Sequence, residues 1–123
     1  MSYLAVAVGG ALGAVLRYAV SGLVQGSGGD GFPLGTLVVN VAGSFIIGLA
    51  LELGTDRFLI SPEARLFITT GLCGGLTTFS TFSYETMRLV EEQQYTAAAG
   101  NIGLSLALCL GAVFLGFMAG RAV

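Results

Sequence analysis

The chain has 123 residues and a formal net charge of −2; hydrophobic residues make up 54% of it and charged residues 10%. An ordinary soluble domain carries about 25% charged residues, so this composition excludes a typical water-soluble protein. The acidic balance also excludes the basic surface of a nucleic-acid-binding protein, and the lack of histidine removes the commonest ligand of a transition-metal centre.

Four long stretches without Asp, Glu, Lys or Arg determine the predicted architecture. They are residues 2–16, 31–51, 66–84 and 93–120. About 20 apolar residues of helix cross the hydrocarbon core of a bilayer, and the first stretch reaches that length once it continues past Arg17. We therefore predict an all-α membrane protein with one domain over residues 1–123. Its transmembrane helices are predicted at residues 3–24, 34–53, 63–91 and 96–120.

One polar side chain in each of the first two predicted helices is a candidate for function. Arg17 lies towards the end of the first helix, where it would either extend to the lipid headgroups or give a vestibule a positive potential that attracts anions. Asn40 lies near the centre of the second stretch, where an amide is costly without a partner. Its N–H groups would serve either a neighbouring helix or a permeating anion. A Gly-rich turn closed by Pro33 joins these helices. The N-terminus lacks the positively charged flank of a secretory signal peptide, so we expect the first helix to be kept as a membrane span.

The third predicted helix starts at Ser61 and Pro62, which suit an N-cap and a first helical position. Gly74 and Gly75 lie in its middle, and the hydroxyl-rich run "TTFSTFS" follows them. In a membrane, non-helical backbone is stable only inside protein or beside a water-filled cavity, and a broken helix exposes groups that coordinate ions. We predict a break at Gly74–Gly75. The alternative is a continuous helix whose Ser and Thr side chains bond to the preceding turn.

Two aromatic residues follow the predicted break on one helix face. Phe79 and Phe82 are three residues apart, and Ser83 projects between them. Because the edge of a phenyl ring carries the positive part of its quadrupole, edge-on rings flanked by hydroxyl donors would hold a small, dehydrating anion. The alternative is a pair of core aromatics that pack against each other.

The remaining polar residues form a shorter pattern. Glu85 lies within one turn of Arg88, so we expect an ion pair between them; the alternative is that Glu85 is a proton or ion site. Asn101, Ser105 and Cys109 are spaced four residues apart and form one stripe on the fourth helix. Both cysteines are expected to be reduced thiols in apolar surroundings.

Glycine pairs one helical turn apart predict close helix packing, because small residues let helix backbones approach each other in lipid. These pairs are Gly9–Gly13, Gly71–Gly75 and Gly116–Gly120.

The arginines bear on the orientation in the membrane. Four spans place both termini on one side, which with the second loop holds Arg57, Arg65 and Arg121, while the other side holds Arg88 and Arg17. This small difference does not fix one orientation under the positive-inside rule. We predict that the chain inserts both ways and that oppositely inserted copies pair about a two-fold axis in the membrane plane.

Three motifs together resemble the Fluc, or CrcB, family of fluoride channels. They are "GGALGAVLRY" in the first helix, "GTLVVNVAGSFIIG" in the second and "GLCGGLTTFSTFSYE" in the third. The resemblance covers essentially the whole chain, and the third motif is the most specific. It implies a passive exporter of toxic cytoplasmic fluoride in the inner (plasma) membrane, built as an antiparallel, dual-topology homodimer with two pores.

The resemblance also implies roles for individual residues. The implied fluoride path consists of Phe79, Phe82, Asn40, Ser80, Thr81, Ser105 and Arg17, with the two phenylalanines contacting fluoride by their ring edges and Arg17 in a vestibule. A structural Na⁺ is implied at the backbone carbonyls of Gly74 and Thr77 of both subunits, since main-chain oxygen suits a hard cation. Cys109 stands where relatives often carry a hydroxyl, and because a thiol is the weaker donor we expect altered throughput there.

Two other classes of function remain as alternatives. The first is a small proton-coupled exporter of the four-helix multidrug type, which also inserts both ways but relies on a carboxylate inside its first helix, where this chain has Arg17. The second is a structural or assembly subunit held by glycine packing. An enzyme is excluded because no nucleophile–base pair or metal-ligand set can be assembled.

Overall fold

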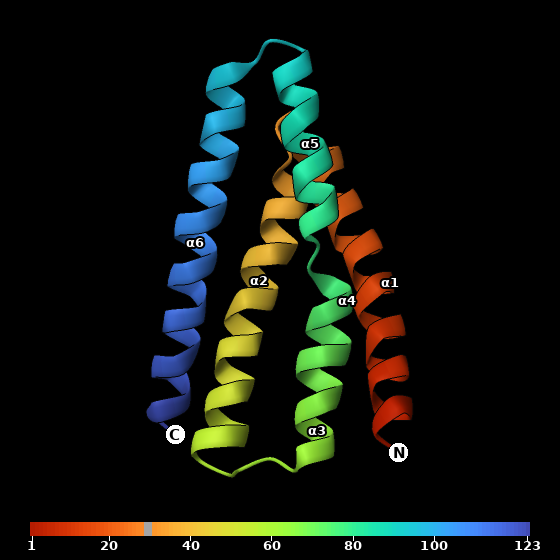
Figure 1. Cartoon of the computed structure of the whole chain (residues 1–123), viewed down its shortest axis with the longest axis vertical. Coiled ribbons are helices and arrows are strands. Elements are labelled where there is room, and N and C mark those ends of the chain that lie inside the picture. Colours follow the sequence, from red (N-terminus) through yellow and green to blue (C-terminus); the bar gives the residue numbers. More distant parts are fainter. Residues whose placement is uncertain (29–30) are drawn as a thin grey trace.

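The computed structural model describes residues 1–28 and 31–123, and the regular structure in this part of the chain is helical. Its elements are α1 (Ser2–Gly28), α2 (Leu34–Leu51), η1 (Glu52–Asp56), α3 (Pro62–Leu66), η2 (Phe67–Cys73), α4 (Gly74–Leu76), α5 (Phe79–Glu91) and α6 (Tyr95–Arg121), where η1 and η2 are π-helical. Figure 1 shows an elongated bundle with both termini and α3 at one end and the α5–α6 turn at the other. Part of the predicted Gly-rich turn, residues 29–30, lies outside the described residues.

Three uninterrupted helices in the described part are long and apolar enough to cross a membrane. They are Ser2–Gly26, Leu34–Asp56 and Tyr95–Arg121, with mean hydropathies of 1.6, 2.1 and 2.3. Of the 18 consecutive residues that are most apolar in each helix, only 11% in the first helix and 17% in the last are buried inside the protein. Apolar helices with such exposed outer faces are typical of spans that contact lipid. The α1 helix continues to Gly28, so it includes part of the segment that we predicted as a turn.

The close helix packing that the glycine spacings predict is found between the first and third helices. Gly9 and Gly13 of α1 face the segment η2–α4, which carries Gly71 and Gly75. A Cβ atom added at Gly9 would lie 2.5 Å from a carbonyl oxygen of η2, and one added at Gly75 would lie 2.5 Å from a carbonyl oxygen of α1. These glycines therefore let two helix backbones touch, which holds the third helix against α1.

The contact between α2 and α6 uses the same principle. A Cβ atom at Gly116 would overlap the carbonyl oxygen of Phe45, and one at Gly48 would overlap the carbonyl oxygen of Val113. Gly120 lies against the side chain of Glu52 instead of against backbone. The two helices thus approach each other at small residues, and the backbone of each helix packs against the other helix.

Charged residues close the end of the bundle that holds the C-terminus. The Arg57 guanidinium donates to the carbonyl oxygens of Gly120, Arg121 and Val123 at 3.2, 3.1 and 3.3 Å. The buried carboxylate of Glu52 pairs with Arg121, whose Nε lies 3.3 Å away. The last carbonyls of a helix have no helical donor, so Arg57 acts as a side-chain cap that ties α6 to the end of α2.

The third helix is interrupted near its midpoint, which confirms the predicted break. The predicted position of the break, at Gly74–Gly75, is wrong. Gly74 has helical angles (φ −60°, ψ −38°), whereas Thr77 (φ −88°, ψ 157°) and Thr78 (φ −153°, ψ 117°) are extended. Gly75 lies within α4, where the lack of a side chain allows its close contact with α1. The threonines suit the break because their hydroxyls satisfy the helix ends: Thr77 donates to Cys73 O at 2.9 Å, and Thr78 caps α5.

Candidate functional site at the helix break

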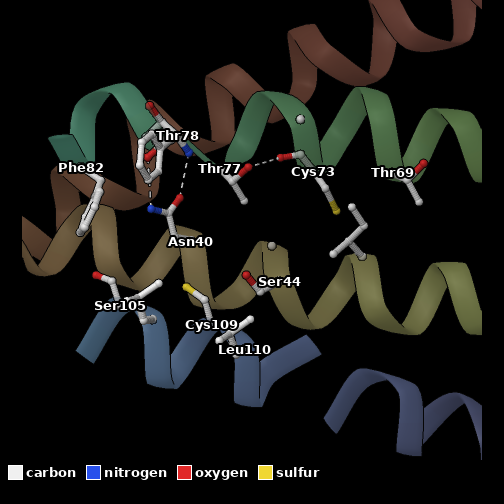
Figure 2. A pocket seen from close by; sticks show the side chains of 15 residues that line it. Asn40, Ser44, Thr69, Cys73, Thr77, Thr78, Phe82, Ser105, Cys109 and Leu110 are labelled. Carbon is white, nitrogen blue, oxygen red and sulfur yellow. Dashed lines mark hydrogen bonds between the residues drawn. The ribbon is translucent and has the colours of Figure 1, made fainter. Parts of the chain in front are cut away.

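A reciprocal pair of hydrogen bonds between α2 and the break anchors the site. Asn40 Nδ2 donates to the Thr78 carbonyl oxygen at 3.2 Å, and the Thr78 N–H donates to Asn40 Oδ1 at 2.8 Å (Figure 2). Both ends of the amide therefore bond to backbone that would otherwise lack a partner. Of the two roles left open by the sequence, the structure shows the bond to a neighbouring helix. A primary amide has two N–H groups, and one remains for another acceptor.

The break frees the carbonyl groups of residues 74–77 from their helical donors. In a continuous helix, the carbonyl of Gly74 would accept from the Thr78 N–H and that of Thr77 from the Thr81 N–H. Instead, Thr78 N–H donates to Asn40 and Thr81 N–H donates to Thr78 Oγ1 at 3.2 Å. Arg17 donates to the carbonyl oxygen of Gly75, and two of the other three freed carbonyls, those of Gly74 and Thr77, are the ones for which the resemblance implies a cation.

Arg17 reaches the same break from α1. Its Nε donates to the carbonyl oxygen of Gly75 at 3.0 Å, and the side chain is half-buried. This carbonyl lies in the last turn of α4, where a helix needs an external donor. The positive charge of Arg17 therefore lies beside the interruption.

The two phenylalanines are adjacent, as their spacing predicts. The ring centroids of Phe79 and Phe82 are 5.4 Å apart and the ring planes are inclined by 41°. Phe79 is 77% exposed although it is a large apolar side chain, whereas Phe82 is half-buried. The Ser83 hydroxyl between them donates to the Phe79 carbonyl oxygen at 2.9 Å, so its hydrogen is directed to backbone and away from the rings.

Three hydroxyls meet at the N-terminus of α5. Thr78 Oγ1 lies 3.3 Å from Ser80 Oγ and donates to Thr81 Oγ1 at 3.1 Å. The N-terminus of a helix carries unpaired N–H groups and the positive end of the helix dipole. This corner is therefore a polar and electropositive surface with hydroxyls of adjustable orientation.

A cavity of about 360 Å³ lies between α2, η2, α5 and α6. It is lined by Asn40, Gly43, Ser44, Ile47, Thr69, Cys73, Gly74, Thr77, Thr78, Phe79, Phe82, Ser105, Leu106, Cys109 and Leu110. None of these described lining residues is acidic or basic. Figure 2 shows Asn40, Phe82 and Ser105 directed towards this space from three different helices.

The cavity gathers most of the predicted site residues but not all of them. Asn40, both phenylalanines, Ser105 and the two carbonyl residues line it. Arg17, Ser80 and Thr81 do not line it, and they lie instead at the break and at the start of α5. The site thus has a neutral cavity and a separate polar corner.

Sequence reasoning missed three polar cavity residues, Ser44, Thr69 and Cys73. A simple signal was present, since Ser44 is one turn beyond Asn40, and Thr69, Cys73 and Thr77 are spaced by four. Both cysteines are free thiols and both line the cavity, as Figure 2 shows. A stripe spaced by four on each of two helices therefore faces the cavity.

The predicted ion pair between Glu85 and Arg88 is wrong. Arg88 pairs with Glu92 at 3.1 Å and donates to the Tyr84 hydroxyl at 3.1 Å. The side chains of Arg88 and Glu92 are 52% and 48% exposed, so both charges of this pair lie at the protein surface. Glu85 Oε1 is buried and has no hydrogen-bond partner among the described residues.

Comparison with known proteins identifies relatives over nearly the whole chain. Residues 4–117 match the family described as CrcB-like protein, Camphor Resistance (CrcB). A Geobacter metallireducens protein is 48% identical over 121 residues, covering 98% of each chain. A Geobacter sulfurreducens protein is 50% identical, covering 96% of this chain and 95% of the relative, and a Thermus thermophilus protein is 52% identical, covering 93% and 85%. Each of these three relatives is named fluoride-specific ion channel FluC.

Proposed function

The chain belongs to the CrcB-like protein family, and we propose that it is a fluoride-selective channel that lets cytoplasmic fluoride leave the cell passively, down its electrochemical gradient. It is a multi-pass membrane protein, which in a bacterium is a protein of the plasma membrane. The observation that carries the proposal is an identity of about half with relatives named fluoride channels over nearly their whole length. Because those relatives are channels by name, we propose no enzymatic activity.

The ring pair supplies the contact that replaces water around the anion. Fluoride is small and strongly hydrated, so a selective path has to compensate for its lost hydration with closely fitted groups. The inclined rings of Phe79 and Phe82 border the cavity. Their role in this proposal is to turn their positively polarised edges to the anion. No lining residue in the described part carries a fixed charge, so the anion is not trapped and can leave.

Hydroxyl and amide donors extend this path. Ser105 Oγ lies 3.5 Å from Asn101 Oδ1, a long contact that leaves the hydroxyl hydrogen able to turn towards the cavity. Asn40 has an N–H beyond the one given to Thr78. Ser80 and Thr81 lie at the electropositive start of α5, and we assign them to the approach to the rings. Arg17 adds a positive potential beside the break that draws anions in.

Two of the freed carbonyls, those of Gly74 and Thr77, support a structural sodium ion at the break. The carbonyls of Gly74 and Thr77 lack their helical donors, and neutral main-chain oxygens suit a hard cation. Hard cations take about six oxygen ligands, so two carbonyls from one chain are too few. A second copy that contributes the same pair would bring the ligand set close to completion.

The exposed ring of Phe79 and the distribution of the arginines also support an antiparallel homodimer. Phe79 lies at the edge of the cavity and is 77% exposed, so one chain does not enclose the anion path. The arginines divide almost evenly between the two ends, which favours insertion in both orientations. Two oppositely inserted copies would cover each other's cavities and form two equivalent pores about a central cation.

Fluoride release from liposomes tests the proposed function. Vesicles that hold potassium fluoride and the purified protein are diluted into fluoride-free buffer, and a fluoride electrode follows efflux after valinomycin is added. We expect fast fluoride efflux, and a chloride electrode on matched vesicles should record none. Efflux that requires a proton gradient would instead identify the proton-coupled exporter, and vesicles that pass neither ion would identify an assembly subunit.

A further inference from the structure

The break separates α5 from the rest of the third helix. Two extended residues, Thr77 and Thr78, interrupt the helical hydrogen bonds that would otherwise align α5 with α4. The orientation of α5 is therefore set by its contacts with other helices. This matters because α5 carries both phenylalanines of the ring pair.

The packing of α5 is thin. Its buried residues are Thr86 and Leu89, whereas Phe79, Tyr84 and Met87 are 77%, 62% and 57% exposed. Apolar burial fixes a helix through many side-chain contacts, and α5 has few of them inside the chain. One of its two buried residues is also polar, so its hydroxyl needs a partner.

That hydroxyl belongs to a buried chain of hydrogen bonds. Asn101 of α6 is 2% exposed, and its Nδ2 donates to Thr86 Oγ1 at 2.9 Å. Thr86 Oγ1 in turn donates to the carbonyl oxygen of Phe82 at 2.8 Å. The chain therefore runs from α6 to the backbone of a ring residue, although neither Asn101 nor Thr86 lines the cavity.

Within the described residues, α5 and its N-cap make side-chain hydrogen bonds to other helices at two places. The first is the Asn40–Thr78 pair at the break, and the second is the Asn101–Thr86 bond. They are eight residues apart, which corresponds to about 12 Å along a helix axis. A helix attached at one point can swing about it, whereas two attachment points fix its direction.

We propose that Asn101 is a positioning residue for the ring pair: by donating to Thr86 it fixes the direction of α5, and so it fixes the place of Phe82 at the cavity. The expected effect on the rate of fluoride passage rests on the proposed function. The geometry itself can be tested without any transport measurement.

A fluorine label on the ring gives that test. 4-Fluorophenylalanine is placed at position 82 alone, and the ¹⁹F spectrum of the full-length protein in detergent is compared among variants. We expect one resonance for the parent, and a broadened or second resonance for both Asn101→Leu and Thr86→Val, which remove the donor and the hydroxyl. Thr86→Ser keeps the hydroxyl and should keep the parent spectrum.

The matched control is Thr36→Val. Thr36 is 6% exposed and Thr86 7%, and Thr36 lies in α2 and takes no part in this chain of hydrogen bonds. An unchanged resonance in Asn101→Leu, or an equal change in Thr36→Val, would overturn the proposal. If Asn101→Leu does not survive purification, Thr86→Val decides the question.

Fluoride efflux from liposomes provides the second measurement. Asn101→Leu and Thr86→Val should each slow efflux about tenfold, the effect of one lost buried hydrogen bond, and the double variant should be no slower. Additive losses would contradict a shared chain. If the parent protein passes no fluoride, the proposed function fails, while the ¹⁹F spectra still decide whether Asn101 positions the ring.

Discussion

At the scale of single residues, the ring pair is the feature whose chemistry is most specific. Phe79→Ile and Phe82→Ile keep an apolar side chain of similar bulk but remove the positively polarised ring edge. Each should slow fluoride efflux from liposomes about tenfold, because an aromatic interaction of about 1.5 kcal/mol corresponds to roughly that factor. Size-exclusion chromatography should show assembly unchanged.

The control for these variants is Phe114→Ile in α6. Phe114 is 57% exposed and lies outside the cavity lining, so its replacement should leave efflux at the parent rate. Parent-like efflux from both ring variants would remove the ring edges from the mechanism. Equal slowing in all three variants would point to a general effect of losing an aromatic residue.

Local spacing predicted residue contacts well where both partners lie on one helix. The adjacency of Phe79 and Phe82 follows from three-residue spacing. The bond between Asn40 and Thr78 joins positions 38 residues apart, so the sequence indicated only that the amide needed a partner. Glu85 shows the limit of the local rule, since Arg88 had three acidic residues within one helical turn and paired with Glu92.

At the scale of elements, the broken third helix separates what composition can predict from what packing decides. Paired glycines and a run of hydroxyls indicated an interruption, and one is present. The break lies beyond the two glycines, which belong to α4, and Gly75 instead packs against the backbone of Gly10 in α1, a contact that the sequence does not display. The extended residues are therefore Thr77 and Thr78, whose side chains cap the two helix ends.

The proposed cation at this break leads to a stability prediction. If Na⁺ joins the freed carbonyls of two copies, replacing it with N-methylglucamine at constant chloride should lower the temperature at which the detergent-solubilised dimer dissociates, because that cation is too large to be coordinated by them. Dissociation is followed by size-exclusion chromatography after heating. An unchanged midpoint over a wide range of Na⁺ concentration would argue against the sodium site.

Close packing of α2 on α6 gives a second prediction at this scale. In Gly116→Ala the new Cβ would overlap the Phe45 carbonyl oxygen, so the helices have to separate, and overpacking of this kind costs about 1–3 kcal/mol. In size-exclusion chromatography after heating, the variant should lose the peak of folded protein at a lower temperature than the parent does. Gly111→Ala is the matched control, since nothing lies within 4 Å of a Cβ at Gly111 in the same helix. Equal stability of the two variants would contradict the backbone contact.

At the scale of the whole molecule, the fold class followed from composition alone. Charge-free stretches predicted helical spans, and three uninterrupted apolar helices and a fourth broken one are present. The cavity was less predictable, because it is assembled from α2, η2, α5 and α6, which are far apart in sequence. Position-by-position polarity indicated which residues face inwards, but the packing of helices decided which of them meet.

Orientation in the membrane yields the last prediction, which concerns how copies combine. Arg57 and Arg121 lie beside the C-terminus, and Arg88 lies in α5, the helix that leads to the opposite end of the bundle (Figure 1). Because this balance is close, two added arginines should fix the orientation. The exposed positions Asp56 and Leu59 serve one end, and Glu91 and Thr96 serve the other.

Each double-arginine variant alone should then populate one orientation and form no antiparallel dimer, so cells that express it should clear fluoride no faster than cells without the channel. Co-expression of the two oppositely biased variants should restore clearance, because each supplies the partner that the other lacks. Clearance by either variant alone, at the parent rate and with its termini accessible from one side only, would mean that the pore does not need an inverted partner. Restoration only on co-expression would instead require that the anion path be built from two chains of opposite orientation.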